Sequence, residues 1–214
     1  GLLGGPGLPK PGQEIALTTK QSFVSAAENA TWPTANLFMR RDVFLAHGGF
    51  DPSLSFFDLF DRATECADTA LAGRVIKSGW GKAFEPRAVI HHELERQTLW
   101  QWIIEPSRLI VLPELVRRHP ELRRDLLVAG YVFYPVSKLL YVAVPAAALF
   151  LWHAPWLLLL LPVALVLRGI QRTGGVNPAA LARHALRVLA NLPRLAVLNL
   201  TLLYGSIRFR SLVI

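Results

Sequence analysis

Cysteine, methionine and charged residues are all scarce in this sequence. Cys66 is the single cysteine among 214 residues, which excludes a framework of disulfides within the chain. Charged residues make up 18% of the chain, below the usual level of about a quarter in soluble domains. Zinc-finger spacing is also lacking, as is a platform of aromatic and basic residues. A nucleic-acid partner is therefore not expected, despite a net charge of +8.

The first residue is Gly1 rather than methionine, and no Lys- or Arg-led signal peptide precedes it. We therefore expect the chain to be a fragment of a longer protein. The positive charge is carried mostly by arginines that flank apolar segments, so membrane lipids with an anionic face are the expected partner of these arginines.

The apolar residues are concentrated between Leu126 and Leu167, and 126–168 is predicted to be a hairpin of two membrane-spanning helices. This segment is about twice the ~20 residues that one spanning helix needs, and Trp152-His153-Ala154-Pro155-Trp156 interrupts it. Arginines flank both ends and the tip has no Lys or Arg, so both ends are expected on the cytoplasmic side. A single long kinked helix is the alternative.

The segments on either side of the hairpin are amphipathic. Residues 96–125 are predicted to form interfacial helices broken at Pro106 and Pro113. Soluble packing helices are the alternative for this segment. Residues 169–214 are predicted to be a basic interfacial helix, starting at Asn177-Pro178, and a cytoplasmic tail.

Short elements are predicted before residue 95. Helices are expected over 42–47 and 68–77, each followed by a glycine stop, and strands over 82–84 and 88–91. Residues 53–66 are interpreted as a loop with an aromatic anchor, in which Asp58 and Asp61 are expected to be solvated.

Polar groups able to do chemistry are concentrated between residues 34 and 93. They occur, in order, in Thr34-Ala35-Asn36, Arg40-Arg41, Gly48-Gly49-Phe50-Asp51, Asp68-Thr69-Ala70-Leu71 with Arg74, and Val89-Ile90-His91-His92. This ordered set resembles the acceptor-side half of family-2 glycosyltransferases, which have the GT-A fold. The resemblance covers about Asn36 to His92.

The resemblance implies an enzyme that transfers a sugar, with inversion, from a nucleotide-sugar donor to a lipid-linked or envelope-glycan acceptor. In that reaction a base accepts the proton of the acceptor hydroxyl, and a divalent cation (Mg2+ or Mn2+) neutralises the leaving diphosphate. The residues that the resemblance assigns are Asp68 as the base, Asn36, Asp51 and Arg74 at the acceptor or diphosphate, and His91 and His92 at the metal.

Simpler roles remain open for each of these residues. Asp68 could be only a helix-start residue, and the histidines could face water at a strand end. Asn36 and Asp51 could shape a pocket as turn and cap residues without touching the sugar. Arg74 could pair with a carboxylate.

The sequence also departs from the family pattern. Ala67 stands where the family usually has Glu, a role that Glu65 could fill in space. Gln97-Thr98-Leu99-Trp100 lacks the arginine of processive synthases, which argues against a long-polymer synthase. No Asp-x-Asp follows a strand, so the nucleotide-binding half, which the cation also needs, is taken to be absent. The fragment alone is expected to be inactive and to bind nucleotide sugar poorly.

The resulting fold class is a partial α/β GT-A domain over 1–95, followed by α-helical membrane segments over 96–125, 126–168 and 169–214. The expected location is the cell membrane, crossed more than once, with the catalytic part on the cytoplasmic side. The alternative function is a catalytically inactive membrane protein that binds a glycan or serves as a scaffold.

Overall fold

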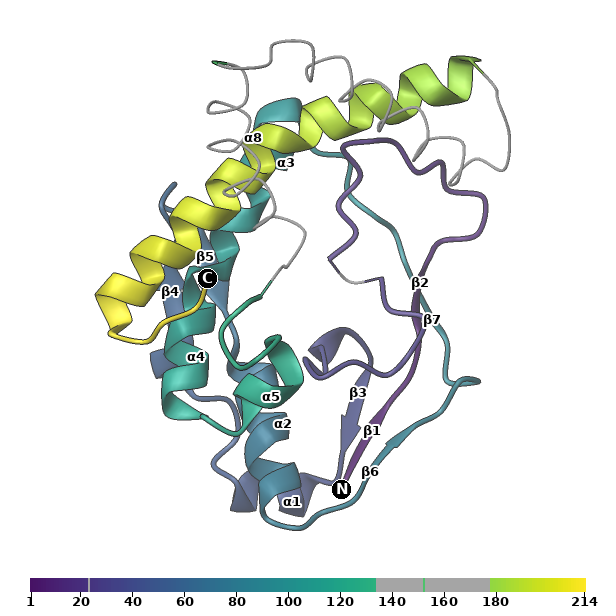
Figure 1. Ribbon diagram of the computed structural model, residues 1–214. Coiled ribbons are helices and arrows are strands. Elements are labelled where there is room, and N and C mark those ends of the chain that lie inside the picture. Colours follow the sequence, from purple (N-terminus) through teal and green to yellow (C-terminus); the bar gives the residue numbers. More distant parts are fainter. Residues whose placement is uncertain (23, 134–151, 153–177) are drawn as a thin grey trace. The chain divides into compact units, whose positions relative to one another are not determined.

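The computed structural model describes residues 1–22, 24–133, 152 and 178–214 (Figure 1). The chain divides into two compact units, one comprising Gly1–Phe133 with Val197–Ile214 and the other Tyr134–Ala196. The described part of the first unit has a mixed α/β fold with small sheets.

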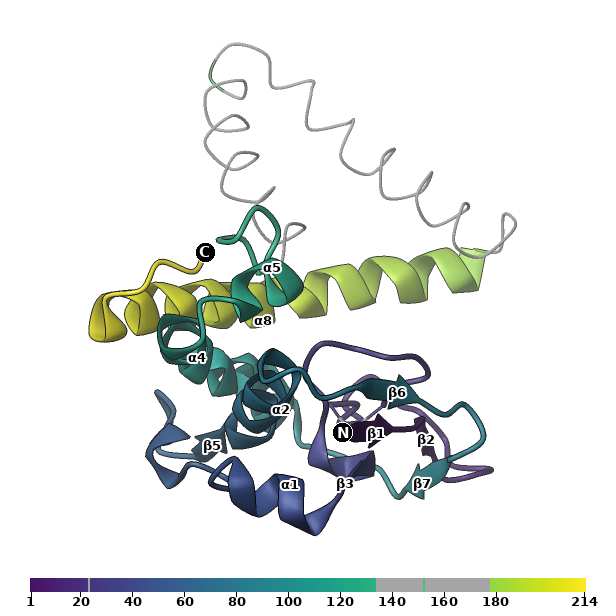
Figure 2. The same ribbon diagram turned by 90° about the horizontal axis from the view of Figure 1, so that it is seen from below.

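The central sheet is built on the first strand of the chain. β1 (Leu2–Gly4) pairs antiparallel with β3 (Leu37–Met39) and parallel with β6 (Lys82–Phe84). A second parallel pair follows, formed by β2 (Gly7–Pro9) and β7 (Ile90–His92). The start of the chain and the 82–92 segment therefore run side by side in the same direction (Figure 2).

Two helices close the core over this sheet. α1 (Arg41–Ala46) and α2 (Ala67–Lys77) confirm the helices predicted at 42–47 and 68–77. Gly79 has a φ of +90°, a left-handed conformation that ends α2 at low cost because glycine has no Cβ. The apolar stripe of α2 packs in a core whose fully or nearly fully buried members are Leu2, Trp32, Val43, Leu71, Ala72 and Val75.

The prediction of a loop over 53–66 is wrong. After η2 (Pro52–Leu54), β4 (Ser55–Phe57) and β5 (Ala63–Glu65) pair as an antiparallel hairpin. The prediction failed because Phe56 and Phe57 were interpreted as a loop anchor, although aromatic residues are also favourable in strands.

Asp58, at the end of β4, was expected in solvent and is instead buried. Its carboxylate accepts hydrogen bonds from Arg62 Nε at 2.8 Å and Ser107 Oγ at 2.6 Å, and Arg62 Nη1 lies 3.2 Å from Glu105 Oε2. Burial raises the pKa of Asp58, but the hydrogen bonds from Ser107 and from the backbone and side chain of Arg62 outweigh it, so the net pKa is lowered. The contacts of Asp58 with Ser107 and of Arg62 with Glu105 fix the hairpin to the helices that follow.

The segment predicted to lie on a membrane packs inside the protein. It forms α3 (Leu99–Ile104), η3 (Glu105–Val111), α4 (Leu112–Arg118) and α5 (Leu122–Leu126). Prolines 106 and 113 lie in the first turns of η3 and α4, as their missing N–H groups allow. Trp102, Ile104 and Ile110 are buried, so protein rather than lipid covers most of the apolar side. The prediction of interfacial helices is wrong here, and the packing-helix alternative describes them.

The last helix, α8 (Pro178–Phe209), begins at the predicted proline. Its final turns and the tail are not free, because Val213 is fully buried and Phe133 N donates to Ile214 O at 2.8 Å. The longest apolar stretch of α8, residues 195–204, is half of the ~20 residues that a span requires.

Within the part of the chain that the structure describes, no helix is long and apolar enough to cross a bilayer. The predicted fold class, which included membrane helices, is therefore wrong for the described residues. The prediction of a multi-pass membrane location depended on those helices and is wrong with it. The hairpin expected over 126–168 does not begin as predicted: α5 ends at Leu126, and 127–133 form a turn with a bridge between Val128 and Val132. Of the remainder, 134–151 and 153–168 lie outside the described residues.

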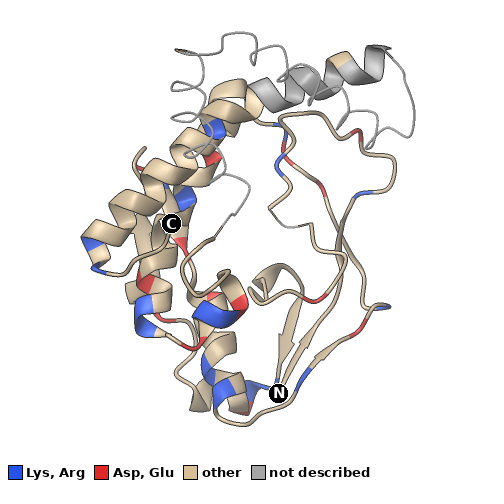
Figure 3. Cartoon of the chain, viewed as in Figure 1, with Lys and Arg blue, Asp and Glu red and all other residues tan. Residues whose placement is uncertain are grey.

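Basic and acidic side chains are interspersed over the first unit (Figure 3). Arg117 pairs with Glu114 at 2.6 Å, and Lys77 lies 3.5 Å from Glu121. Arg117, one of the arginines that were assigned to a lipid face, is therefore paired within the protein.

Asp58→Asn should lower the free energy of unfolding by about 3 kcal/mol, because it removes one partner of a buried pair. Asp61→Asn is the matched control: Asp61 is exposed in the same turn at a φ of 57°, which asparagine also tolerates, so little change is expected. Urea unfolding of both variants measures the difference.

The contribution of Asp58 to the free energy of unfolding should also depend on pH. Its folded-state pKa is lower than the ordinary value of 3.8, so its stabilisation is present above 3.8 and is lost as pH falls through the lower folded pKa. The difference between wild type and Asp58→Asn should therefore shrink only on strong acidification. A difference that disappears already at neutral pH would contradict this assignment.

Candidate functional site

Asp68 lies in the first turn of α2 and is half-buried. Oδ1 accepts a hydrogen bond from Thr69 N at 2.8 Å, and Oδ2 accepts one from Thr34 N at 3.2 Å. The carboxylate therefore lies at the positive end of the helix dipole. Each carboxylate oxygen keeps a further lone pair, so Asp68 can still accept a proton from a ligand.

The start of α2 is attached to the 31–36 segment at two points. Besides the bond from Thr34 to Asp68, Thr69 Oγ1 donates to Thr31 O at 2.8 Å. The predicted base is thus held against the segment that carries the predicted Asn36.

The two residues just before Asp68, Cys66 and Ala67, are buried. Ala67 is 6% exposed, so the glutamate expected there in the family would be buried. Glu65 is exposed on β5. Burial, and next the charge of Asp68, raises the pKa of Cys66 to about 12. Cys66 is therefore a protonated thiol rather than a nucleophile.

Asn36 is a buried clamp between strands. Its Nδ2 donates to Pro6 O at 3.0 Å and to Ala88 O at 2.7 Å, which ties the β1–β2 connection to the residues before β7. These two carbonyl groups require the amide nitrogen on their side. Gly5 lies so close that a Cβ would overlap the carbonyl of Ala88. The simpler role, a residue that shapes the pocket, fits this geometry.

Arg74 and Asp51 support the same loop. Arg74 Nη2 donates to Gly49 O at 2.6 Å and Nε to His47 O at 3.3 Å, so the guanidinium binds backbone carbonyls of the Gly48-Gly49 turn. Asp51 caps η2 by accepting from Ser53 N at 2.9 Å and Ser53 Oγ at 2.6 Å. The hydrogen bonds from Ser53, followed by the charges of Arg118 and Arg74, lower the pKa of Asp51.

His91 and His92 are neighbours in β7. Successive strand residues point to opposite faces, so the two imidazoles do not converge on one ion. His91 is exposed, with Nδ1 3.1 Å from Pro9 O. In the described ranges, no group of three or more His, Cys, Asp or Glu side chains could hold a metal. The two histidines therefore do not fit a shared cation site by themselves.

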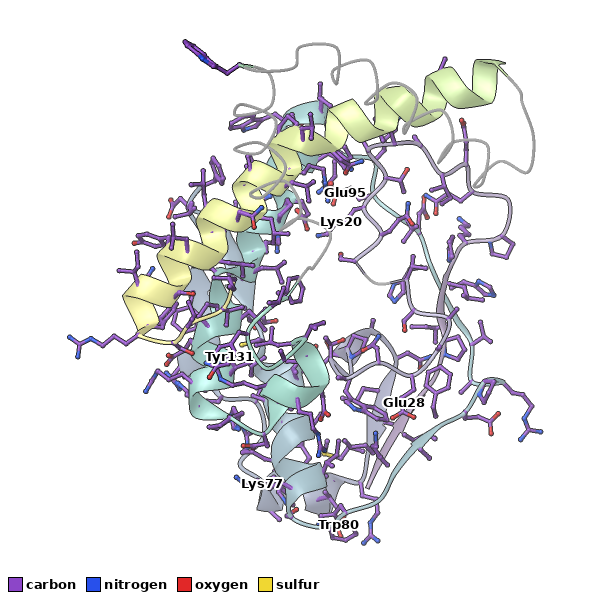
Figure 4. All side chains as sticks on the ribbon, viewed as in Figure 1. Lys20, Glu28, Lys77, Trp80, Glu95 and Tyr131 are labelled. Atoms are coloured by element: carbon purple, nitrogen blue, oxygen red, sulfur yellow. The ribbon has the colours of Figure 1, made fainter. Side chains whose placement is uncertain are left out.

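A pocket that the sequence did not predict opens where β1 and β6 end. Its cavity volume is about 20 Å3, and the space between its walls reaches about 350 Å3 only when the open solvent above them is included. Its floor includes Trp32 and Asn36, which are 5% and 7% exposed, and its rim includes the exposed Glu28 and Asn29. Phe84 forms part of the wall at the end of β6. Glu28 lies beside the strands of the central sheet in Figure 4.

The rim of this pocket is ordered by local hydrogen bonds. Asn29 Nδ2 donates to Ser25 Oγ at 2.9 Å, Asn29 Oδ1 accepts from Thr31 N at 3.0 Å, and Ser25 N donates to Gly7 O at 2.9 Å. Trp32 has a φ of 45°, which is unusual for a bulky residue and more so before a proline. The sequence signal available for this pocket was the Trp32-Pro33 pair, which follows the polar Glu28-Asn29 pair. No hydrophobic periodicity marks this segment.

Arg74→Ala should cost about 2 kcal/mol of stability, because two backbone carbonyls lose a charged donor. Lys77→Ala, one turn later on α2, removes only an exposed pair with Glu121 and should change stability by less than about 0.5 kcal/mol. Thermal or urea unfolding compares the two. Equal stability of both variants would show that Arg74 does not hold the turn and would return it to the list of ligand-binding residues.

Comparison of the chain with protein-family models, with curated proteins and with solved structures gives no match. The functional argument therefore depends on the residues and geometry of the chain itself.

Proposed function

We propose that this chain supplies the acceptor side of an inverting glycosyltransferase, with Asp68 as the general base. One observation carries the proposal: a half-buried carboxylate at a helix start is hydrogen-bonded to the 31–36 wall of a pocket. That pocket lies at the carboxyl ends of two parallel strands, where open α/β sheets commonly bind their ligands.

In the proposed reaction the acceptor is a sugar or glycan with a free hydroxyl. Its oxygen attacks the anomeric carbon of the donor sugar from the side opposite the nucleoside diphosphate. A new C–O bond forms as the bond to the phosphate oxygen breaks, and the hydroxyl proton passes to Asp68. The configuration at the anomeric carbon is therefore inverted.

The rest of the site orients Asp68. The N–H groups of Thr34 and Thr69 fix the plane of the carboxylate, so a proton acceptor is in place before the acceptor binds. Because the 214 residues contain no Asp-x-Asp, the donor-binding half is proposed to come from sequence beyond these residues.

Asp68→Asn in the full-length protein should reduce turnover by about 100- to 10,000-fold, the usual contribution of a general base. Asparagine has one side-chain oxygen, so it can keep the hydrogen bond from Thr34 or the one from Thr69 but not both, and the melting temperature should fall by only a few degrees. Asp61→Asn is the matched control, since it removes an exposed carboxylate seven residues earlier that has no proposed role in the reaction. Transfer is measured with radiolabelled nucleotide sugars and a panel of glycoside acceptors.

Near-normal turnover of a well-folded Asp68→Asn protein would refute the assignment of the base. A loss of turnover that is equal in Asp61→Asn would mean that negative charge in the region, rather than Asp68 itself, is required.

A binding protein without catalysis is the second candidate. Two observations favour it: Ala67 replaces the usual acidic residue, and the pocket is formed without Asp68 in its lining. Saturable glycoside binding by a full-length protein that turns over no nucleotide sugar would support this candidate over the enzyme.

A further inference from the structure

We propose that Thr69 is a positioning residue: its side chain holds the 31–34 segment where the Thr34 N–H group reaches the carboxylate of Asp68. This inference deepens the proposed function and rests on it for the role of Asp68 as the base. Thr69 is 5% exposed, so it acts through Asp68 rather than on a substrate.

Two neighbouring residues of α2 hold two residues of the 31–34 segment. Thr69 Oγ1 donates to Thr31 O at 2.8 Å, and Asp68 Oδ2 accepts from Thr34 N at 3.2 Å. The first distance is the usual one for a hydroxyl donor, whereas the second is at the long end of the range for an N–H donor. The contact of Thr69 is therefore the tighter of the two, and a shift of Thr31 away from α2 would break the bond to Asp68.

The backbone between the two bonds is in a conformation that needs support. Trp32 has a φ of 45°, and the next residue is Pro33, whose ring fixes its own φ at −64°. A left-handed conformation in a bulky residue persists only where the surrounding contacts hold it. Thr69 supplies such a contact directly before Trp32, so without it the backbone can relax at Trp32 and carry the Thr34 N–H group away.

The Thr69 hydroxyl is committed to this contact. It has a single hydrogen, and Thr31 O at 2.8 Å is a much better acceptor than Asp68 Oδ1 at 3.5 Å. Valine at position 69 would place a methyl group against the Thr31 carbonyl. That carbonyl would then have to turn toward water to recover a hydrogen bond.

The test measures steady-state transfer by the full-length protein with radiolabelled nucleotide sugars and glycoside acceptors. Thr69→Val should lower kcat about tenfold and change KM for the acceptor by less than about twofold, because a misplaced base weakens the transition state rather than binding. Thr69→Ser keeps the hydroxyl and should restore kcat to within about twofold of wild type.

Thr64→Val is the matched control. Thr64 is also a buried threonine, and its Oγ1 donates to a carbonyl oxygen 44 residues away, that of Arg108, at 2.9 Å. Both valine variants should lower the melting temperature by a few degrees, because each loses one hydrogen bond. Only Thr69→Val should lower kcat; an equal loss in Thr64→Val would show general loosening and overturn the inference.

Two further measurements separate a positioning role from a merely structural one. In an Asp68→Asn background, Thr69→Val should lower kcat by less than about twofold, because the residue through which it acts is already lost. A full tenfold loss in that background would overturn the inference. Hydrogen exchange of the Thr34 amide, followed by NMR, should become about tenfold faster in Thr69→Val and stay unchanged in Thr64→Val.

Failure of this inference can be told apart from failure of the proposed function. If Asp68→Asn abolishes transfer while Thr69→Val leaves kcat and the exchange of Thr34 unchanged, the base stands and the positioning role is overturned. If Asp68→Asn transfers normally, the proposed base is overturned. Faster exchange of Thr34 in Thr69→Val would then mark a contact without a role in transfer, which overturns the positioning role as well.

Discussion

Two hydrogen bonds from the buried amide of Asn36 join three separate parts of the chain. They reach Pro6, between β1 and β2, and Ala88, ahead of β7, while Asn36 itself ends the segment that holds Asp68. Loss of the amide would leave two buried carbonyls without donors, at about 1–3 kcal/mol each. The separation of the parallel strands, the floor of the pocket and the placement of the carboxylate all depend on this clamp.

The local elements could largely be predicted, because their causes are local. The apolar spacing of α2, the glycine after it and the short strand at 82–84 all follow from residues within one turn or one strand. The first-turn position of Asp68 follows in the same way. Its hydrogen bond to Thr34 does not, because that partner is 34 residues away in the sequence.

The predictions that failed concerned what surrounds particular side chains in the folded protein. An amphipathic pattern shows that one face needs cover but not what covers it: Trp102 is buried in the protein while Trp100, two residues earlier, is 60% exposed. Asp58 looked like a loop carboxylate because Ser107, its partner, lies 49 residues further on. Arg74 was expected at the acceptor or diphosphate, and the contacts that the structure shows for it are with the carbonyl groups of His47 and Gly49. The pocket escaped prediction because its walls come from three stretches of chain and from no repeated spacing.

The close approach at Gly5 has a consequence for how sequences with this architecture can vary. With no space between position 5 and the Ala88 carbonyl, a larger residue there must displace one of the two acceptors of the Asn36 amide. Substitution at position 5 is therefore coupled to positions 36 and 88. Among related chains, these three sites should change together or remain glycine, asparagine and a small residue, and that joint variation would trace the clamp through chains whose other residues have diverged.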